Sequence, residues 1–268
     1  VLMKNAANQM HGLSLHYYTV KGWSGSKGSA TKFTEDDFYW TMGKALEIED
    51  VIKKHIEIMD KYDPQKRVGL LLDEWGTWWD EEPGTIGGHL YQQNALRDAF
   101  VASLTFDVFH KYTDRLTMAN IAQMVNVLQA MILTNDKGGM VLTPTFHVFN
   151  MYKVHQDATY LPIDIQTEKK NVRDNRVVPL LSTDKTGTIH ISLSNIDARS
   201  SQEVTIELSD INNKTIKGEI LTSSNLTDHN TFENPNKVKI MPFNGVSKTK
   251  NGLIVKLPAK SIVTLEIK

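Results

Sequence analysis

The spacing of apolar residues divides the chain into two regions. From residue 1 to about residue 157, apolar runs alternate with segments whose apolar side chains recur every three or four positions, as on one face of a helix. From about residue 158, apolar and polar residues alternate singly, as in strands with one buried face. The pattern therefore predicts strand–helix units over 1–157 and a β-sandwich over 158–268.

The first region is predicted to contain parallel strands joined by helices. GLSLHYY (12–18) and VGLLLDEW (68–75) are short and apolar, and the second is apolar at consecutive positions, as strands buried on both faces are. Three segments have the apolar spacing of helices: 45–59, 95–109 and 143–156. The segment 116–133 contains a short strand and a helix whose division the pattern leaves open. About three strand–helix units are visible, whereas a closed (β/α)8 barrel needs eight.

The second region shows several short alternating runs separated by turn-rich connections such as NIDARSS, DINNK and NPNK. The apolar positions of three of these runs are Ile189, Ile191 and Leu193; Val204, Ile206 and Leu208; and Leu253, Val255 and Leu257. Short strands of this kind are typical of an antiparallel sandwich.

Composition narrows the function classes. The net charge is -1, from 30 basic and 31 acidic residues, and no basic stripe occurs, so neither nucleic acid nor an anionic membrane is an expected partner. Cysteine is absent, which removes disulfides and thiolate chemistry. No apolar run reaches the roughly 18 residues that span a membrane. The nine histidines do not fall into metal-ligand spacing, so no metal and no cofactor are expected.

Glu74 is the first candidate for chemistry. It closes an apolar strand, and catalytic groups of βα-barrels lie at the carboxyl ends of strands. Trp75 and Trp78, with Trp79, offer flat apolar faces and N–H donors to a sugar ring. The alternative is that Asp73 or Glu74 caps the following helix and the indoles belong to the core.

A second strand ends in His16, Tyr17 and Tyr18. Such a strand end can present a general acid or donors to sugar hydroxyls, or it can form an aromatic plug at the rim of a barrel. Together with the tryptophan-rich segment, it favours a carbohydrate pocket.

The sequence resembles glycoside hydrolase family 51, the α-L-arabinofuranosidases, in segments that follow the family's order from residue 12 to the C-terminus. These segments are SLHYYT, LDEWGTWW, MANIAQMVNVLQAMILT, LTPTFHVFNMYKVHQDA, LTDHNTFENPNKV and LPAKSIVTLEI. The resemblance implies the C-terminal part of a (β/α)8 barrel followed by a jelly-roll-type β-sandwich. It also implies that Glu74 is the nucleophile after barrel strand seven, and that His16 and Tyr18, after strand six, contact the sugar or the catalytic carboxylates. Trp78 matches a tryptophan that lines the family's pocket.

Family members retain anomeric configuration with two glutamates, and the acid/base glutamate belongs to an Asn-Glu pair after barrel strand four. This sequence contains no Asn-Glu pair. We therefore expect the chain to be the C-terminal part of the enzyme, from about strand six onward, with the N-terminal part of the same enzyme as its missing partner. Alone, it is expected to be inactive.

The implied function is release of non-reducing terminal α-L-arabinofuranosyl residues from arabinan- or arabinoxylan-type oligosaccharides and polysaccharides. Two alternatives remain open: another retaining glycosidase of the same clan, and a non-catalytic carbohydrate-binding protein. Family members are commonly oligomers, so a homo-oligomer stays open. The sequence does not distinguish cytoplasmic, periplasmic and secreted locations.

Overall fold

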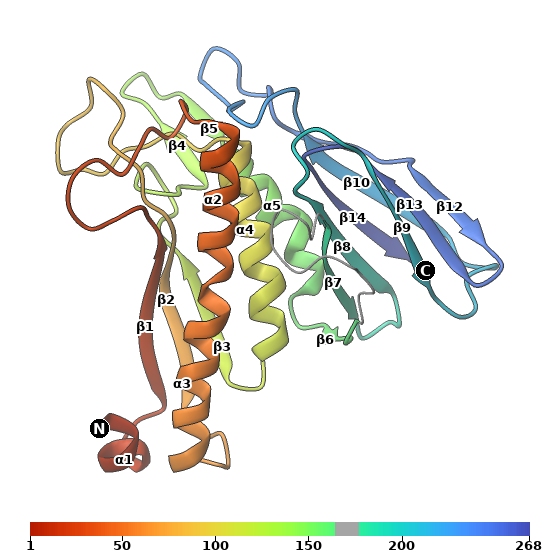
Figure 1. Cartoon of the computed structure of the whole chain (residues 1–268), viewed down its shortest axis with the longest axis horizontal. Helices are drawn as coiled ribbons and strands as arrows, with labels where there is room; N and C mark the ends of the chain where they lie inside the picture. The colour runs from red at the N-terminus through yellow and green to blue at the C-terminus, as the bar shows by residue number, and fades with distance from the viewer. Residues whose placement is uncertain (164–176) are drawn as a thin grey trace.

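The computed structural model describes residues 1–163 and 177–268. Figure 1 shows two regions side by side, a parallel sheet with helices packed on one face and an antiparallel sandwich. Strands β1 (Gly12–Thr19), β2 (Gly69–Thr77) and β3 (Leu116–Ile121) form the parallel sheet, in the order β1-β2-β3. A short helix, α1 (Leu2–Ala6), and a 3-10 turn, η1 (Ala7–Gln9), precede β1.

Three longer helices connect these strands. The predicted helix around 45–59 is two helices, α2 (Glu35–Leu46) and α3 (Ile48–Tyr62), which meet at Glu47. The side chain of Thr34 accepts a hydrogen bond from the backbone N–H of Asp37, and the Asp37 carboxylate accepts one from the N–H of Thr34, so a capping box starts α2. Helix α4 (Leu96–Phe109) is buried at every position except Phe106, because it lies between the sheet and the sandwich.

The helix expected within 116–133 is absent, and this part of the prediction is wrong. After β3 the chain forms an irregular loop that leads to the hairpin of β4 (Ile132–Thr134) and β5 (Met140–Leu142). Asn126 and Leu128 in this loop have φ angles of 61° and 52°, in the left-handed region, which an α-helix does not contain. The Asn126 side chain bonds to the backbone N–H and the hydroxyl of Thr134, 2.7 Å each, and so ties the loop to β4.

Helix α5 (Pro144–Tyr152) follows where the sequence predicts it, with Pro144 in the first turn and the Thr143 hydroxyl accepting from the backbone N–H of Phe146. Two further 3-10 turns are η2 (His110–Tyr112) and η3 (Lys153–His155). The predicted boundary at 157–158 lies between η3 and the first strand of the sandwich; as a domain boundary it stays a prediction.

The sandwich consists of two antiparallel sheets. The larger sheet has the order β11-β10-β14-β8-β7-β6 and the smaller one β12-β13-β9. Their strands are β6 (Thr159–Tyr160), β7 (Val177–Thr183), β8 (Ile189–Asn195), β9 (Gln202–Glu207), β10 (Ile216–Thr222), β11 (Ile240–Pro242), β12 (Val246–Thr249), β13 (Gly252–Leu257) and β14 (Ser261–Ile267). The runs with period two are thus β8, β9 and β13, and their apolar side chains fill the space between the sheets.

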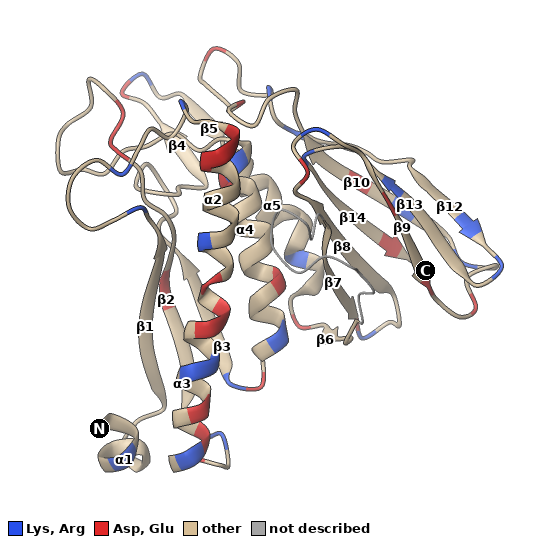
Figure 2. Cartoon of the chain, viewed as in Figure 1, with Lys and Arg blue, Asp and Glu red and all other residues tan. Residues whose placement is uncertain are grey.

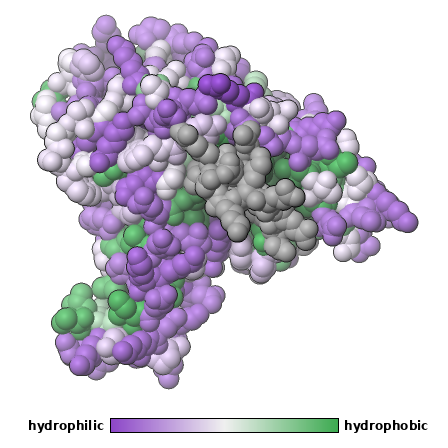
Figure 3. All heavy atoms as spheres, viewed as in Figure 1, coloured by the Kyte–Doolittle hydropathy of each residue, from purple (hydrophilic) through white to green (hydrophobic). Residues whose placement is uncertain are grey.

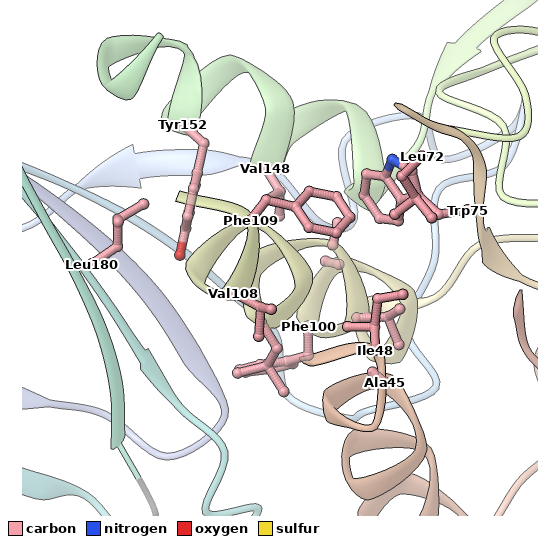
Figure 4. Close-up of a cluster of buried hydrophobic side chains, with 14 of the residues drawn as sticks. Ala45, Ile48, Leu72, Trp75, Phe100, Val108, Phe109, Val148, Tyr152 and Leu180 are labelled. Atoms are coloured by element: carbon pink, nitrogen blue, oxygen red, sulfur yellow. The ribbon is translucent and has the colours of Figure 1, made fainter. Parts of the chain in front are cut away.

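A single buried cluster joins the two regions. It contains Leu72 of the parallel sheet, Phe100 of α4 and Leu180 of the larger sandwich sheet, and Figure 4 shows these side chains around α4 and α5. Burial of such continuous apolar area is the main favourable term in folding. The helices of the first region therefore pack against the sandwich, and the sandwich fixes their position.

The opposite face of the parallel sheet is exposed in this chain. Met118 of β3 is 40% exposed, and at the start of the chain Val1 is 98% exposed. Figure 3 shows hydrophobic atoms gathered at the end of the molecule where α1 lies. Within residues 1–163 and 177–268, no helix is long and apolar enough to cross a membrane.

Candidate active site

The carboxyl ends of β1 and β2 bring the predicted site residues together. The strands run parallel, and His16 pairs with Glu74 and Tyr18 with Gly76. Side chains two residues apart on a strand share a face, so Ser14, His16 and Tyr18 point away from the helices. Figure 2 shows the acidic residues of β2 as a red segment within an otherwise uncharged strand.

A bulge in β2 determines which side chains reach this face. The pairing shifts after Leu15 and Leu72, so Asp73 is an extra residue in β2. Leu72 and Trp75 both enter the core beside the helices, although they are three residues apart. Asp73 and Glu74 therefore both lie on the opposite face, which a regular strand does not allow for adjacent residues.

The Glu74 carboxylate has two neighbours from β1. The Tyr18 hydroxyl donates to Oε2 at 2.7 Å, and Nδ1 of His16 lies 3.4 Å from the same oxygen. The Glu74 side chain is 44% exposed, which leaves it accessible from outside. Burial, together with the hydrogen bond to Glu74 and its charge, raises the pKa of Tyr18, so the phenol remains a donor at neutral pH.

The second ring nitrogen of His16 faces another carboxylate. Nε2 lies 3.1 Å from Oδ1 of Asp73, and the Ser14 hydroxyl lies 2.8 Å from each Asp73 oxygen. Sequence reasoning did not assign Ser14 and Asp73 to the site. Ser14 could have been predicted from the sequence, because it alternates with His16 and Tyr18 along β1. Asp73 could not, because no sequence pattern indicates the bulge that places it on this face.

Trp78 lies at the edge of this group. Its ring centroid is 5.3 Å from that of Tyr18 and 5.8 Å from that of Trp23, both in edge-to-face geometry. Nζ of Lys27 lies 5.4 Å from the Trp78 ring centroid. Trp23 and Lys27 come from the loop before α2, which the sequence predicted only as a connection.

Trp75 does not line the site, and its assignment as a substrate-binding residue is corrected. Its side chain is 1% exposed and packs against Phe106, Phe109 and Phe149, with ring centroids 5.5, 5.4 and 6.1 Å away. Figure 4 shows the indole beside Leu72 and Phe109. The bulge at Asp73 is the reason, because it turns Trp75 toward the helices. Trp75 is therefore part of the hydrophobic core, which was the alternative that the sequence left open.

Trp79 is likewise a core residue. Its indole N–H donates to Asp98 at 2.8 Å, and the Arg97 guanidinium lies 3.7 Å from its ring centroid. The other face of Arg97 covers Phe33, 3.8 Å away, which attaches the loop that carries Trp23 to α4. Of the three tryptophans in this segment, only Trp78 is available to a ligand.

Asp80 holds the same loop from the other side. Its carboxylate accepts from the backbone N–H groups of Lys27 and Gly28, at 2.7 and 3.2 Å, and from the Ser26 hydroxyl. Burial opposes ionisation of this carboxyl, but the hydrogen bonds prevail and lower its pKa. Within the part of the chain that the structure describes, no cluster of three or more His, Asp and Glu side chains could hold a metal ion.

The chain is similar to known proteins in sequence and in fold. The family described as alpha-L-arabinofuranosidase C-terminal domain matches residues 73–261. An intracellular exo-alpha-L-arabinofuranosidase of Bacteroides ovatus is 70% identical over 271 residues, covering 100% of this chain and 52% of that protein. The crystal structure of the GH51 arabinofuranosidase from Xanthomonas axonopodis pv. citri is similar, with a TM-score of 0.92 and 44% identity, over 100% of this chain and 55% of that one.

A more distant structure, the alpha-L-arabinofuranosidase from Thermotoga maritima, shares the fold with a TM-score of 0.78 at 21% identity, over 99% of this chain and 54% of that chain. The predicted fold class is thereby confirmed: the end of a (β/α)8 barrel followed by a β-sandwich. The chain spans about half the length of the relatives it matches. With a family match over most of its residues, this chain belongs to the alpha-L-arabinofuranosidase C-terminal domain family.

Proposed function

We propose that this chain carries the nucleophile half of a retaining exo-α-L-arabinofuranosidase, with Glu74 as the nucleophile. The observation that carries the proposal is the position of Glu74 at the carboxyl end of β2, where Tyr18 and His16 contact its carboxylate. Both contacts are made to Oε2, so we assign the attack on the anomeric carbon to Oε1. The Tyr18 hydroxyl donates to the carboxylate and so fixes its orientation for attack.

In the first step Glu74 bonds to the anomeric carbon, and the bond from that carbon to the leaving oxygen breaks as the oxygen gains a proton. In the second step water adds to the anomeric carbon, gives up a proton, and releases the Glu74 carboxylate. One carboxyl group outside this chain supplies the first proton and accepts the second. We expect it to lie about 5 Å from Glu74, as in retaining enzymes generally.

Two features support arabinofuranosyl groups at the non-reducing end of arabinan- or arabinoxylan-type glycans as the substrate. The Bacteroides ovatus relative carries the name of an exo-acting arabinofuranosidase and is 70% identical over the whole of this chain. The half-buried indole of Trp78 adjoins Glu74 through Tyr18 and offers an apolar wall to a sugar ring.

The test is Glu74→Ala in the full-length protein, assayed with a nitrophenyl α-L-arabinofuranoside. We expect turnover to fall by about 1000-fold or more, because the covalent step is lost. Added azide should restore turnover and yield an arabinofuranosyl azide of inverted configuration, since azide then takes the place of the carboxylate. Glu57→Gln, at an exposed position of α3, is the matched control and should behave as the parent.

Parental turnover by Glu74→Ala would contradict the assignment of the nucleophile. A parent protein that binds arabino-oligosaccharides without cleaving them would instead support the carbohydrate-binding alternative. Cleavage of a different glycoside would support another retaining glycosidase.

A further inference from the structure

The imidazole of His16 lies between two carboxylates. Nδ1 is 3.4 Å from Oε2 of Glu74, and Nε2 is 3.1 Å from Oδ1 of Asp73. The mechanism above uses Glu74 and His16 and gives Asp73 no part. An ionisable group that contacts a group of the site, without reaching the substrate itself, is a candidate for orienting it.

The two ring nitrogens cannot both donate in a neutral imidazole. A neutral ring carries one N–H, and only the protonated ring donates from both nitrogens. Between two carboxylates, a neutral imidazole can therefore offer its single N–H to only one of them. The orientation in which the His16 ring faces Glu74 therefore depends on the partner of Nε2. That partner is Asp73.

Asp73 is itself held in place. The Ser14 hydroxyl lies 2.8 Å from both of its oxygens, and the bulge in β2 directs its side chain to the face that Ser14 and His16 share. Among the described residues, His16 is the only basic side chain that forms an ion pair with Asp73. The carboxylate is thus fixed by one neutral donor and aimed at one imidazole.

We propose that Asp73 is a positioning residue for the reaction: its carboxylate pairs with Nε2 of His16 and so holds the ring with Nδ1 facing Glu74. This inference rests on the function proposed above. Asp73 acts through His16 and forms no bond to the sugar. The competing interpretation is that Asp73 only secures the bulge between β1 and β2 through Ser14.

Asp73→Asn in the full-length protein tests the proposal, because it removes the charge and keeps the size. We expect kcat on a nitrophenyl arabinofuranoside to fall about 10- to 100-fold, the usual effect of losing an orienting contact, while KM changes less than about twofold. Asp114→Asn is the control; that carboxylate pairs with Lys66 just before β3 begins, at the opposite end of the sheet, and should leave kcat unchanged.

A double-mutant cycle separates the two interpretations. If Asp73 acts through His16, Asp73→Asn should change kcat less than about twofold in a His16→Gln background. An equal fall in both backgrounds would overturn the proposal. Ser14→Ala, which disturbs the bulge contact alone, should cost much less than Asp73→Asn; equal losses would favour the purely structural interpretation.

A readout independent of turnover is the ¹⁵N signals of the His16 imidazole, assigned by their loss in His16→Gln. We expect Asp73→Asn to shift the Nε2 signal toward the value of a nitrogen without a carboxylate partner, whereas Asp114→Asn leaves it in place. Unchanged signals in Asp73→Asn would overturn the contact. If the parent enzyme fails to cleave arabinofuranosides, the proposed function fails, and these signals still decide whether Asp73 orients His16.

Discussion

The two kinds of sheet in this protein differ in how completely their strands are covered. In β14, at the centre of the sandwich, six of seven residues are buried, whereas in β1 only two of eight are. Apolar side chains cover the larger sandwich sheet from both sides, from the smaller sheet and from α4 and α5. The parallel sheet is covered by helices on one face, and its other face presents Ser14, His16, Asp73 and Glu74.

The difference indicates that the buried cluster provides most of the stability, whereas the exposed face of the parallel sheet carries the candidate catalytic groups. Burial in the shared cluster supplies the free energy that holds the helices against the sandwich. The exposed face of the parallel sheet contributes little to that burial and carries the polar groups. Changes on the two sides should therefore separate stability from activity.

The largest expected effect concerns the isolated chain. We expect purified residues 1–268 to show no turnover of a nitrophenyl α-L-arabinofuranoside, because the proposed mechanism takes its acid/base carboxyl group from the rest of the full-length protein. The full-length protein, assayed at the same concentration, is the reference. Hydrolysis by the isolated chain would mean that residues 1–268 contain a sufficient site.

Trp75 and Trp78 allow the roles of the two faces of the parallel sheet, stability and sugar binding, to be tested separately. Trp75→Ala should lower the free energy of unfolding by about 3–5 kcal/mol, because a large buried side chain leaves a cavity. Trp78→Ala should change it by less than about 1 kcal/mol and instead weaken sugar binding. Denaturant unfolding and ligand titration of both full-length variants measure the two effects. A stable Trp75→Ala protein with weakened binding would reverse our correction.

A smaller effect on stability is expected when the pH is lowered, because His155 lies at the junction of the two regions. His155 is buried, and its ring nitrogens lie 2.7 Å from the Ser182 and Ser192 hydroxyls. Burial, and next the nearby His110 and His190, lower the pKa of His155 to about 3. Between pH 6.5 and 3 the unfolded chain therefore binds more protons at this residue, so stability falls as the pH decreases through that range.

His155→Gln removes this titration. The stability difference between parent and variant should shrink by about 2 kcal/mol from pH 7 to pH 4.5. Asp107, whose pKa burial raises, has the opposite pH dependence but is present in both proteins and largely cancels. Exposed His11→Gln is the control. A difference that stays constant with pH would mean that folding does not change the protonation of His155.

The smallest effect is expected at the exposed bridge between the regions. Nε of Arg199 lies 2.9 Å from Oε2 of Glu35 at the start of α2, with the arginine side chain 79% exposed. Arg199→Ala should leave the free energy of unfolding nearly unchanged, because solvent screens such pairs. A large loss of stability in denaturant unfolding would show that ion pairing, and not the shared apolar cluster, holds the regions together.

Periodicity predicted the elements whose burial is regular. Leu70 and Leu72 identified β2, the alanine-rich face of α4 identified that helix, and Ile191 and Leu193 identified β8. The segment after β3 was mispredicted because its apolar residues follow a helical spacing, while Asn126 and Leu128 adopt left-handed backbone angles. Those angles depend on contacts with β4, which lie outside the local sequence.

The candidate site was predictable in part for the same reason. Glu74, His16 and Tyr18 end strands, and strand ends can be recognised from sequence. The environment of Trp75 was not predictable from alternation, because alternation assumes a regular strand and β2 contains an extra residue. Whether an indole faces the core or the ligand depends here on that one residue.

The bulge at Asp73 also has a consequence for how this segment tolerates mutation. Deletion of Asp73 would restore regular alternation, with Leu72 and Trp75 still toward the helices and Glu74 still on the opposite face, whereas deletion of Leu71 would turn Leu72 away from the helices. The extra residue therefore serves the polar face of the sheet, because the core face of β2 does not need it. Deletion of Asp73 in the full-length protein should therefore leave more folded protein than deletion of Leu71, measured as soluble yield and unfolding midpoint.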